Sequence, residues 1–451
     1  MSKIKTKKQG VKKISKLTVI NPKVAGIDVS DKEMMVAFPV NSEQLEIRAF
    51  ECFTQDLHSI AKTLKEHDIT SVAMESTGVY WVCLFLLLQD YGFEVYLVNA
   101  KHAKNVTGRK DDESDAEWLQ KLHSCGLLRS SFQPDNMTRT LRSLVRHRKN
   151  LVRSSTTYLN RIQKALELMN LKLHTVISDI DGKTGRMIIE AILAGERNPE
   201  VLADMRDKRI KASREIIIKS VEGYWTTEHL FELKQCYSLF CQHQQHIKDC
   251  DLEIENQLLV QITAASNNDV ISEVEVKKIK RKPSGKNRVS FNLTAYLNEL
   301  SGVNVTEIMG INELSALTIM SEVGLDMSKW KTEHHFTSWL GLAPNTKISG
   351  GKEISSRIGK KKHYAGQAFR IAANSLHSSK SPLGDHFRRL KARAGAGKAV
   401  VATARKLSII YYKMIINQQS FNPNALLEFQ QKYKQKKINQ LRMKLAKLEA
   451  A

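Results

Sequence analysis

The feature that most constrains the fold is the order of the short apolar segments between residues 24 and 98. Three of them, at 24–30, 33–40 and 44–51, follow one another at intervals of only a few residues. Segments this short, separated by turn-sized links, predict strands joined as hairpins. The chain therefore begins its globular part with an antiparallel meander.

The next segments change the pattern from hairpins to strands and helices in alternation. A stretch of helical periodicity at 54–67 precedes an apolar segment at 71–76, and an apolar helix from Val79 precedes another at 93–98. A three-stranded meander followed by strand, helix and strand is the order of a ribonuclease H-like sheet. Asp28 and Glu75 stand near the carboxyl ends of two of these predicted strands.

The middle of the chain has a different, helical pattern. Between residues 137 and 262, two long stretches repeat apolar residues at intervals of three and four, with basic residues between those of the first stretch. Such stretches form either an antiparallel helical hairpin or a dimerising coiled coil. Residues 263–302 then become polar and strongly basic, which indicates a linker or a basic insertion.

The predicted fold class is therefore α/β plus all-α: a ribonuclease H-like domain, a long helical coiled-coil middle and a mainly helical C-terminal domain. The predicted boundaries are a basic arm (1–20), the α/β domain (21–136), the helical domain (137–262), the linker or insertion (263–302), the C-terminal domain (303–420) and a charged terminal helix (421–451).

The charge of the chain indicates its partner. Lys and Arg number 70 against 47 Asp and Glu, which gives a formal net charge of +23. A soluble chain this basic most often binds a polyanion, and nucleic acid is favoured over a membrane surface or a merely basic exterior. The six cysteines show no metal-ligand spacing, and no apolar run is long enough to span a bilayer, so the prediction is a cytoplasmic protein without membrane contact.

Four carboxylates fall within residues 111–115, just after a basic stretch. Together with Asp28 and Glu75 they would repel one another if they converged, unless cations lay between them. Two Mg²⁺ ions about 4 Å apart are the usual solution for phosphoryl transfer, and oxygen donors without Cys or His favour Mg²⁺ or Mn²⁺. The alternative is that the acidic residues only complement the dipole of a helix that begins there. Spacing alone leaves open which of Asp111, Asp112 and Glu113 takes part.

The segment "KISGGKEISSRIGKKKHYAGQAFR" near residue 350 combines a serine, two glycines and many cations. Glycines allow a nucleic-acid backbone to approach closely, and cations neutralise charge on a phosphate undergoing substitution. Taken alone, Ser349 is more typical of a plain loop than of a nucleophile, because a serine hydroxyl needs activation. The predicted nucleic-acid contacts are Lys110, Lys347, Lys352, Arg357, Lys360, Lys361, Lys362 and Arg405.

A second candidate contact lies upstream, where "TEIMGINELSALTIM" indicates a helix–hairpin–helix with its turn at Gly310. Such a turn presents backbone N–H groups to a phosphate, but it is equally typical of a purely structural turn. Asn312 replaces the usual second glycine and tolerates a left-handed conformation. The stretch "AGAGK" before Ala399 lacks the spacing and the hydroxyl of a nucleotide-binding loop, so no nucleotide cofactor is expected.

The fragments "GIDVS", "MESTGVYW", "VNAKHAKNVTGRKDDESDAEWL" and "LGLAPNTKISGGKEISSRIGKKKHYAGQAFRIAA" together resemble the DEDD-type transposases of insertion sequences, the bridge-RNA-guided recombinases. The resemblance spans two blocks in the order typical of that family. It implies a RuvC-like N-terminal domain with four acidic metal ligands, which correspond here to Asp28, Glu75, Asp112 and Asp115. This chain has Asp111 where the family has threonine.

The resemblance also implies that Ser349, at the family's "SGG" position, is the nucleophile, with Ser355 and Ser356 as the fallback candidates. It implies an Mg²⁺-dependent recombinase that forms a serine–DNA link, a structured guide RNA as partner, and a homo-oligomer, either dimer or tetramer. The active site would then be completed within one chain or between two. A bacterial, nucleoid-associated location follows from the same resemblance.

Two other functions fit the residues. A RuvC-like junction resolvase or nuclease would use the carboxylates with water as nucleophile and would leave free DNA ends. A non-catalytic nucleic-acid scaffold would need neither the carboxylates nor the serine. The recombinase is preferred because it accounts for both blocks.

Overall fold

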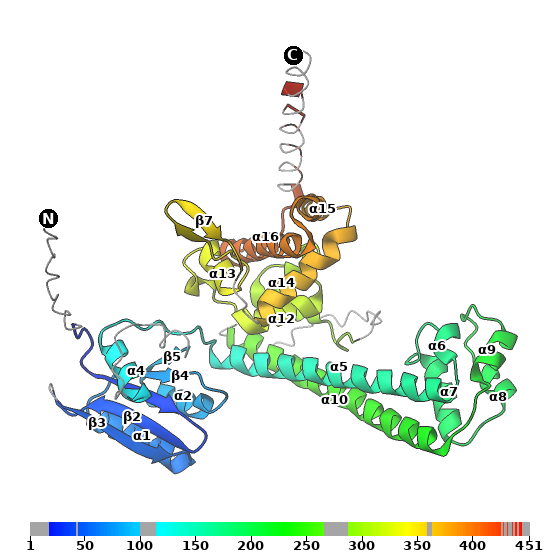
Figure 1. Cartoon of the computed structure of the whole chain (residues 1–451), viewed down its shortest axis with the longest axis horizontal. Helices are drawn as coiled ribbons and strands as arrows, with labels where there is room; N and C mark the ends of the chain where they lie inside the picture. Colours follow the sequence, from blue (N-terminus) through cyan, green and yellow to red (C-terminus); the bar gives the residue numbers. More distant parts are fainter. Residues whose placement is uncertain are drawn as a thin grey trace, which may run out of the picture. The chain divides into compact units, whose positions relative to one another are not determined.

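The structure is a computed structural model that describes residues 18–41, 44–99, 114–265, 287–358 and 363–424, together with a few residues after 426. The chain divides into two compact units, one up to Gln133 and one from Pro134 onward, which are described separately (Figure 1). Most of the predicted basic arm and of the predicted terminal helix lies outside the described residues. No helix among the described residues combines the length and the apolar character needed to cross a membrane.

The N-terminal unit is built on one five-stranded sheet. Its strands are β1 (Val24–Val29), β2 (Glu33–Pro39), β3 (Leu45–Glu51), β4 (Ser71–Glu75) and β5 (Glu94–Val98), in the order β3-β2-β1-β4-β5. The first three strands pair antiparallel, and β1, β4 and β5 pair parallel. The predicted meander and the strand–helix–strand that follows it are confirmed.

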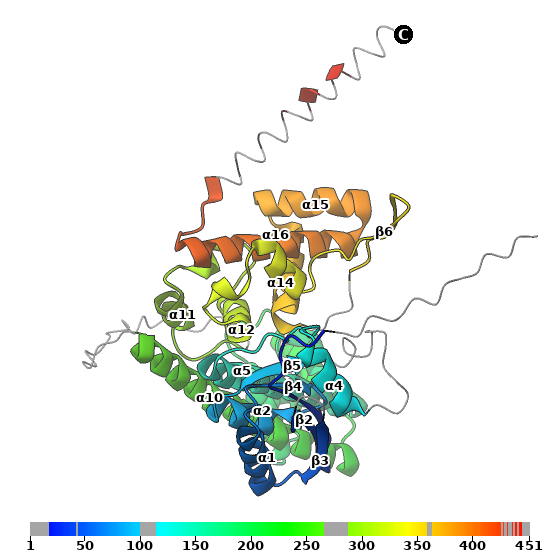
Figure 2. The same cartoon turned by 90° about the vertical axis from the view of Figure 1, so that its left-hand side faces the viewer.

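Helices cover both faces of this sheet (Figure 2). On one face, α1 (Thr54–Glu66) and α2 (Trp81–Asp90) pack on alternate residues of the strands and form the larger core, which includes Ile27 and Met74. On the other face, α4 (Asp115–Ser124) packs through Trp118, Leu119 and Leu122. Because side chains alternate along a strand, the residues between the core positions face α4.

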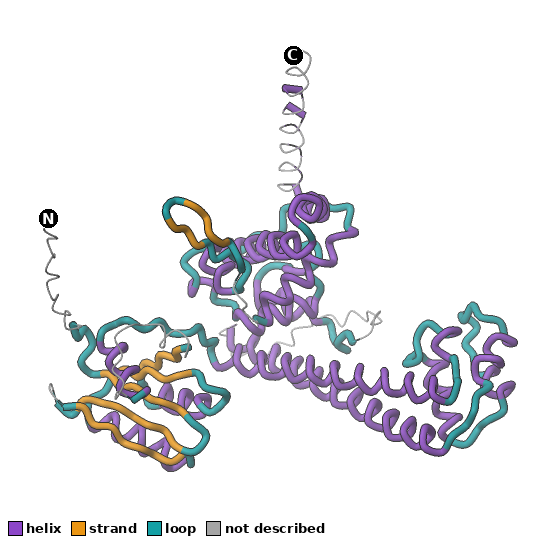
Figure 3. Tube along the Cα trace, viewed as in Figure 1, coloured by secondary structure: helices purple, strands orange, loops and turns teal. Residues whose placement is uncertain are grey.

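The C-terminal unit begins with two long helices that lie side by side and run in opposite directions (Figure 3). They are α5 (Asn136–Leu168) and α10 (Thr227–Ala265). Their far end carries α6 (Leu173–Val176), α7 (Lys183–Leu193), α8 (Pro199–Asp204) and α9 (Arg214–Val221), which share an apolar cluster with both long helices. The long helices form a hairpin within one chain, which is one of the two arrangements that the pattern predicts.

The rest of this unit is a helical body with one small β-hairpin. Rings of Phe336, Phe369 and Tyr411 meet at its centre, with centroids 5.7 to 6.5 Å apart. Its elements are α11 (Leu293–Ser301), η1 (Val305–Glu307), α12 (Glu313–Val323), η2 (Met327–Lys329), α13 (Glu333–Trp339), β6 (Lys347–Ser349), β7 (Lys352–Ser355), α14 (Tyr364–Ser375), η3 (Leu376–Ser378), α15 (Pro382–Ala394) and α16 (Ala396–Asn417).

The segment expected as a linker, 263–302, contains helical structure at both ends. Helix α10 continues to Ala265, and α11 packs on α10 with Leu293 and Leu297 buried. The hydroxyl of Tyr296 donates a hydrogen bond of 2.7 Å to Glu255 of α10. Residues 266–286, which hold most of the basic run, lie outside the described residues.

The predicted helix–hairpin–helix is not formed as two α-helices around Gly310. The segment before the turn is the three-residue 3₁₀ helix η1, which the side chain of Asn304 caps by accepting a hydrogen bond from the N–H of Thr306. Asn312 has extended backbone rather than a left-handed conformation, because it is the N-cap of α12 and accepts from the N–H of Ser315. Gly310 has a φ of +91°, and an added Cβ would lie 2.6 Å from the carbonyl oxygen of Ala372.

Candidate active site

Asp28 and Glu75 lie side by side at the carboxyl ends of adjacent parallel strands. The register pairs Ile27 of β1 with Met74 of β4, so the next residue in each strand is one of these carboxylates. Neighbouring strands are about 5 Å apart, which sets the spacing of the two backbones. Glu75 is buried and Asp28 half-buried. Both residues therefore stand near the carboxyl ends of strands, as the sequence predicts.

Both carboxylates belong to the face of the sheet that α4 covers. Gly26, two residues before Asp28, lies against the backbone of α4: an added Cβ would be 2.3 Å from the carbonyl oxygen of Ala116 and from the amide nitrogen of Gln120. Ala73, two residues before Glu75, belongs to the apolar cluster that includes Trp118 and Leu119 of α4. Since side chains alternate in period two, Asp28 and Glu75 share that face.

The start of α4 brings a third carboxylate to the same side of the sheet. Ser114 is the N-cap; its side chain accepts from the N–H of Glu117, and Glu117 accepts from the N–H of Ser114. This reciprocal capping box fixes Asp115 as the first residue of the helix, one position before the Ala116 that contacts Gly26. The position also suits the alternative reading, in which Asp115 complements the helix dipole.

The other end of α4 is anchored to the sheet by a buried polar pair. Nε2 of His123 lies 2.8 Å from the hydroxyl of Ser71 on β4, and the imidazole ring packs against Tyr96 of β5. Burial lowers the pKa of His123, while the nearby Glu94 opposes this shift. The neutral imidazole thus holds the helix by a hydrogen bond without placing a charge in the core.

The remaining acidic candidates cannot be placed. Asp111, Asp112 and Glu113, and also Lys110, lie outside the described residues, and α4 begins only at Asp115. Within the described part of the chain, no three Asp, Glu, His or Cys side chains are close enough together to hold a metal ion. The donors that the sheet does assemble are carboxylate oxygens, which fit Mg²⁺ or Mn²⁺ better than a softer metal.

Ser349 lies at the tip of the hairpin formed by β6 and β7. It pairs with Lys352 across Gly350 and Gly351, whose φ angles are +56° and +74°. Positive φ at both central residues is the two-residue turn that favours glycine. An added Cβ on either glycine would meet nothing within 4 Å, so turn geometry rather than close packing accounts for the pair. Ser349 is exposed, and the sequence reading of this segment as a loop is replaced by a hairpin.

Part of the predicted basic surface surrounds this serine. Lys347, Lys352 and Arg357 are exposed on or next to the hairpin, whereas Lys360, Lys361 and Lys362 lie outside the described residues. Ser355 ends β7, and Ser356 follows it. Arg405 lies on α16, where its guanidinium is 3.4 Å from Nδ1 of His334.

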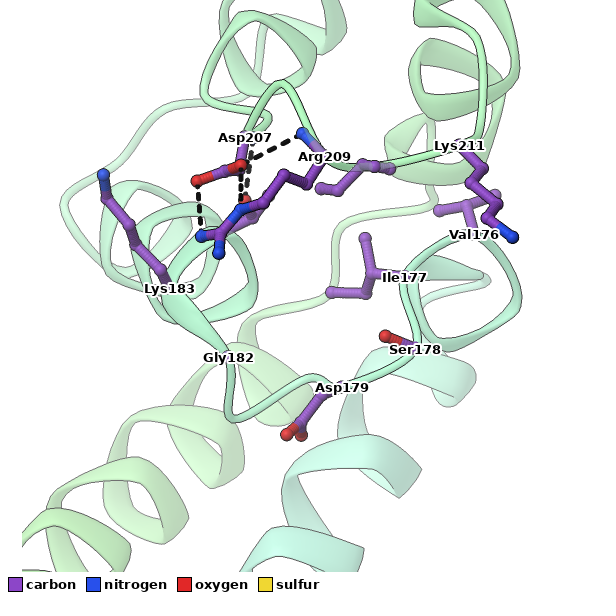
Figure 4. Close-up of a pocket in the computed structure, with 11 residues that line it drawn as sticks. Val176, Ile177, Ser178, Asp179, Gly182, Lys183, Asp207, Arg209 and Lys211 are labelled. Carbon is purple, nitrogen blue, oxygen red and sulfur yellow. Dashed lines mark hydrogen bonds and ion pairs between the residues drawn. The ribbon is translucent and has the colours of Figure 1, made fainter. Parts of the chain in front are cut away.

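The cavity drawn in Figure 4 belongs to neither set of candidates. It has a volume of about 590 Å³ and lies among the short helices at the far end of α5 and α10. Its rim holds an ion pair in which Arg209 donates to both oxygens of Asp207 at 2.9 and 3.1 Å. Lys183 and Lys211 add further charge, but none of the predicted site residues lines it.

Sequence reasoning missed Gly26, which controls how closely α4 approaches the two carboxylates. The signal was present, because a glycine inside an otherwise bulky buried strand often marks a close backbone approach. The flanking residues Ala25 and Ile27 are fully buried on the opposite face. Only the tertiary structure, however, shows that the backbone approaching Gly26 is that of α4.

Comparison with known families gives two matches along the chain. Residues 25–171 match a family model described as a transposase. Residues 303–387 match a second one, described as transposase IS116/IS110/IS902 family. The first match contains the sheet with Asp28, Glu75 and Asp115, and the second contains the hairpin with Ser349. No curated protein matches the chain significantly.

Proposed function

Because the chain belongs to the IS116/IS110/IS902 family of transposases, which are enzymes that act on DNA, we propose that it cuts and joins DNA strands through a serine–DNA intermediate. The N-terminal unit, which we assign to the RuvC-like class of ribonuclease H-like folds, supplies the acidic residues, and the C-terminal unit supplies Ser349. The observation that carries the proposal is the grouping of Asp28, Glu75 and the start of α4 on one face of the sheet.

Asp28, Glu75, Asp112 and Asp115 are the residues that would hold a divalent cation. A bound Mg²⁺ or Mn²⁺ would supply charge stabilisation for a phosphate undergoing substitution. The chain's own part is to fix those oxygens. Strand pairing aligns Asp28 with Glu75, and the contact of α4 with Gly26 sets the depth of Asp115.

Ser349 is proposed as the nucleophile. Its Oγ forms a bond to phosphorus as one P–O ester bond of the strand breaks, and the released strand end leaves as a hydroxyl that takes up the serine proton. The two-glycine turn presents the hydroxyl at the tip of an exposed hairpin, and Lys347 and Lys352 flank it. Cations at this place stabilise the additional negative charge of the phosphorus centre.

The guide RNA and the homo-oligomer are also part of the proposal. They rest on the family resemblance and on the excess of basic residues. In an oligomer, the carboxylates and the serine that act on one phosphodiester could come from one chain or from two copies.

The deciding experiment compares Ser349→Ala with Asp28→Ala in a DNA strand-cleavage assay with the element's own ends. Ser349→Ala should abolish the covalent protein–DNA adduct seen after denaturing electrophoresis. Ser355→Ala and Ser356→Ala serve as matched controls on the same segment and should keep the adduct. Adduct at the wild-type level in Ser349→Ala would remove this serine from the mechanism.

Asp28→Ala should lose strand cleavage altogether, and EDTA should do the same to the wild-type chain until Mg²⁺ is restored. Cleavage that leaves free ends in Ser349→Ala, at the wild-type rate, would instead indicate a nuclease with water as nucleophile. Cleavage that survives Asp28→Ala would refute the role of the carboxylates.

A further inference from the structure

The two long helices of the C-terminal unit carry opposite charge. Helix α5 contains eight Lys or Arg residues and a single Glu. Its packing partner α10 contains six Asp or Glu residues and two Lys. An antiparallel pair needs only complementary apolar faces, so this separation of charge exceeds what the packing requires.

Some of the cations of α5 are used inside the unit. Arg148 forms a buried ion pair with Asp251 of α10. Arg146 donates to both oxygens of Glu322 on α12, at 2.7 and 2.8 Å, and Arg142 lies 3.4 Å from the same carboxylate. These three arginines join α5 to its neighbours and are not available to another molecule.

Four other cations of α5 remain exposed: Lys149, Arg153, Arg161 and Lys164, which we call the α5 stripe. Helical periodicity places them within one side of the helix over about 22 Å, since each residue advances 1.5 Å. Within the described part of the chain, none of the four forms an ion pair with a carboxylate. Burial, and after it the charge of Arg153, lowers the pKa of Lys149, while Glu322 opposes the shift.

The exposed residues between the cations of the α5 stripe are polar and uncharged. Thr156, Thr157 and Asn160 lie between the cations and are exposed. Phosphate oxygens accept hydrogen bonds and never donate them, and hydroxyl and amide groups are common donors to them beside Lys and Arg. The hydroxyls of Thr156 and Thr157 donate to the carbonyl oxygens of Val152 and Arg153, at 2.9 and 3.1 Å, so the donors that face outward here are the four cations and the amide of Asn160. Over these four turns of helix no carboxylate lies among them.

We propose that the α5 stripe is a binding surface for the sugar–phosphate backbone of double-stranded DNA. This inference rests on the transposase assignment, which makes DNA the polyanion that the chain must handle. Flexible lysine and arginine side chains along an exposed helix face suit contacts to phosphate rather than the reading of bases. The stripe therefore contributes affinity that does not depend on sequence, separate from the chemistry at Ser349.

The test measures binding of the full-length protein to a short DNA duplex without divalent cations, so that no strand is cut. The stripe variant carries Lys149→Gln, Arg153→Gln, Arg161→Gln and Lys164→Gln. The matched control removes the same number of exposed charges elsewhere in the unit, by Lys208→Gln, Lys211→Gln, Lys234→Gln and Lys248→Gln. Melting temperatures of both variants should stay near that of the wild type.

Each phosphate contact steepens the salt dependence of binding by a log–log slope of about 0.9. Four lost contacts should reduce the slope by about 3.6, so the advantage of the wild type over the stripe variant should shrink about 100-fold between about 50 and 200 mM salt. The control variant should keep the wild-type slope. An unchanged slope in the stripe variant would overturn the proposal.

Two further outcomes would also overturn it. Weakened binding of an RNA duplex with unchanged DNA binding would assign the stripe to RNA. Unchanged binding of both with a smaller assembly in light scattering would assign it to a second copy, whose acidic α10 is the natural counterpart. Because this assay involves no strand cleavage, its failure leaves the proposed role of Ser349 untouched.

Discussion

Gly26→Ala should damage the enzyme more than its size suggests. The new methyl group would be 2.3 Å from the carbonyl oxygen of Ala116 and 2.3 Å from the amide nitrogen of Gln120. Both are backbone atoms of α4, so no side chain can turn aside. To restore ordinary contact distances, α4 must move away from the sheet by about 1 Å, which is the scale at which misplaced catalytic groups cost about 100-fold in rate.

The stability cost follows from the same contact. Overpacking of this kind costs about 1 to 3 kcal/mol, which lowers the melting temperature of a unit of this size by about 5 to 15 °C. The DNA strand-cleavage rate is measured well below that lowered melting temperature. The expected result is a folded protein that has lost about 100-fold in rate, because Asp115 has moved relative to Asp28 and Glu75.

Leu57→Ala is the matched control. Leu57 is buried on α1, on the opposite face of the sheet, and its truncation costs about 2 to 4 kcal/mol. This variant should be at least as unstable as Gly26→Ala yet cleave DNA at close to the wild-type rate. Equal losses of rate in the two variants, or wild-type cleavage by Gly26→Ala, would refute the idea that α4 sets the geometry of the site.

Three further predictions concern the C-terminal unit. Glu322→Gln should lower the free energy of unfolding by about 3 kcal/mol in denaturant titration, because it leaves Arg142 and Arg146 without their buried counter-charge; a loss below about 1 kcal/mol would contradict this. His386 has its pKa lowered to about 4 by burial and by Lys406 and Arg389. The unfolded imidazole titrates near 6.5, so its contribution to stability is complete above about pH 6.5 and is lost as the pH falls towards 4. His386→Gln should flatten the dependence of melting temperature on pH in that window, and an unchanged profile would count against it. Gly350→Ala with Gly351→Ala, which puts two side chains at positive φ, should abolish adduct formation while leaving the melting temperature unchanged; a normal adduct yield would show that the turn is dispensable.

The N-terminal unit was largely predictable from sequence because its strands are short and closely spaced. Links of a few residues leave no choice but hairpins, and the apolar stretches between later strands leave room only for helices. The same order placed Asp28 and Glu75 at strand ends. The pairing register depends on contacts between β1 and β4, whose paired residues are 47 positions apart, and the face covered by α4 depends on contacts between segments about 90 residues apart. No local pattern contains either kind of contact.

In the C-terminal unit, the prediction of a helix–hairpin–helix was wrong where short polar side chains, rather than apolar periodicity, determine the local structure. Asn304 and Asn312 each cap a different element, so the stretch around Gly310 became a 3₁₀ helix and an α-helix. The basic composition after residue 263 concealed α11, whose apolar residues lie within a single short turn-and-helix segment. The charge separation between α5 and α10 was visible in the sequence, but its meaning depends on which cations are exposed.

The length of the hairpin formed by α5 and α10 is proportional to the number of residues in the two helices. The short helices α6 to α9 at its end share apolar contacts, including Ile188, Leu202 and Val221, that do not depend on the length of the two long helices. Adding seven residues to each long helix would move these short helices outward by about 10 Å and rotate them by only about 20°. Insertions or deletions of seven residues in both helices would therefore change the length of the hairpin while preserving the contacts at each of its ends.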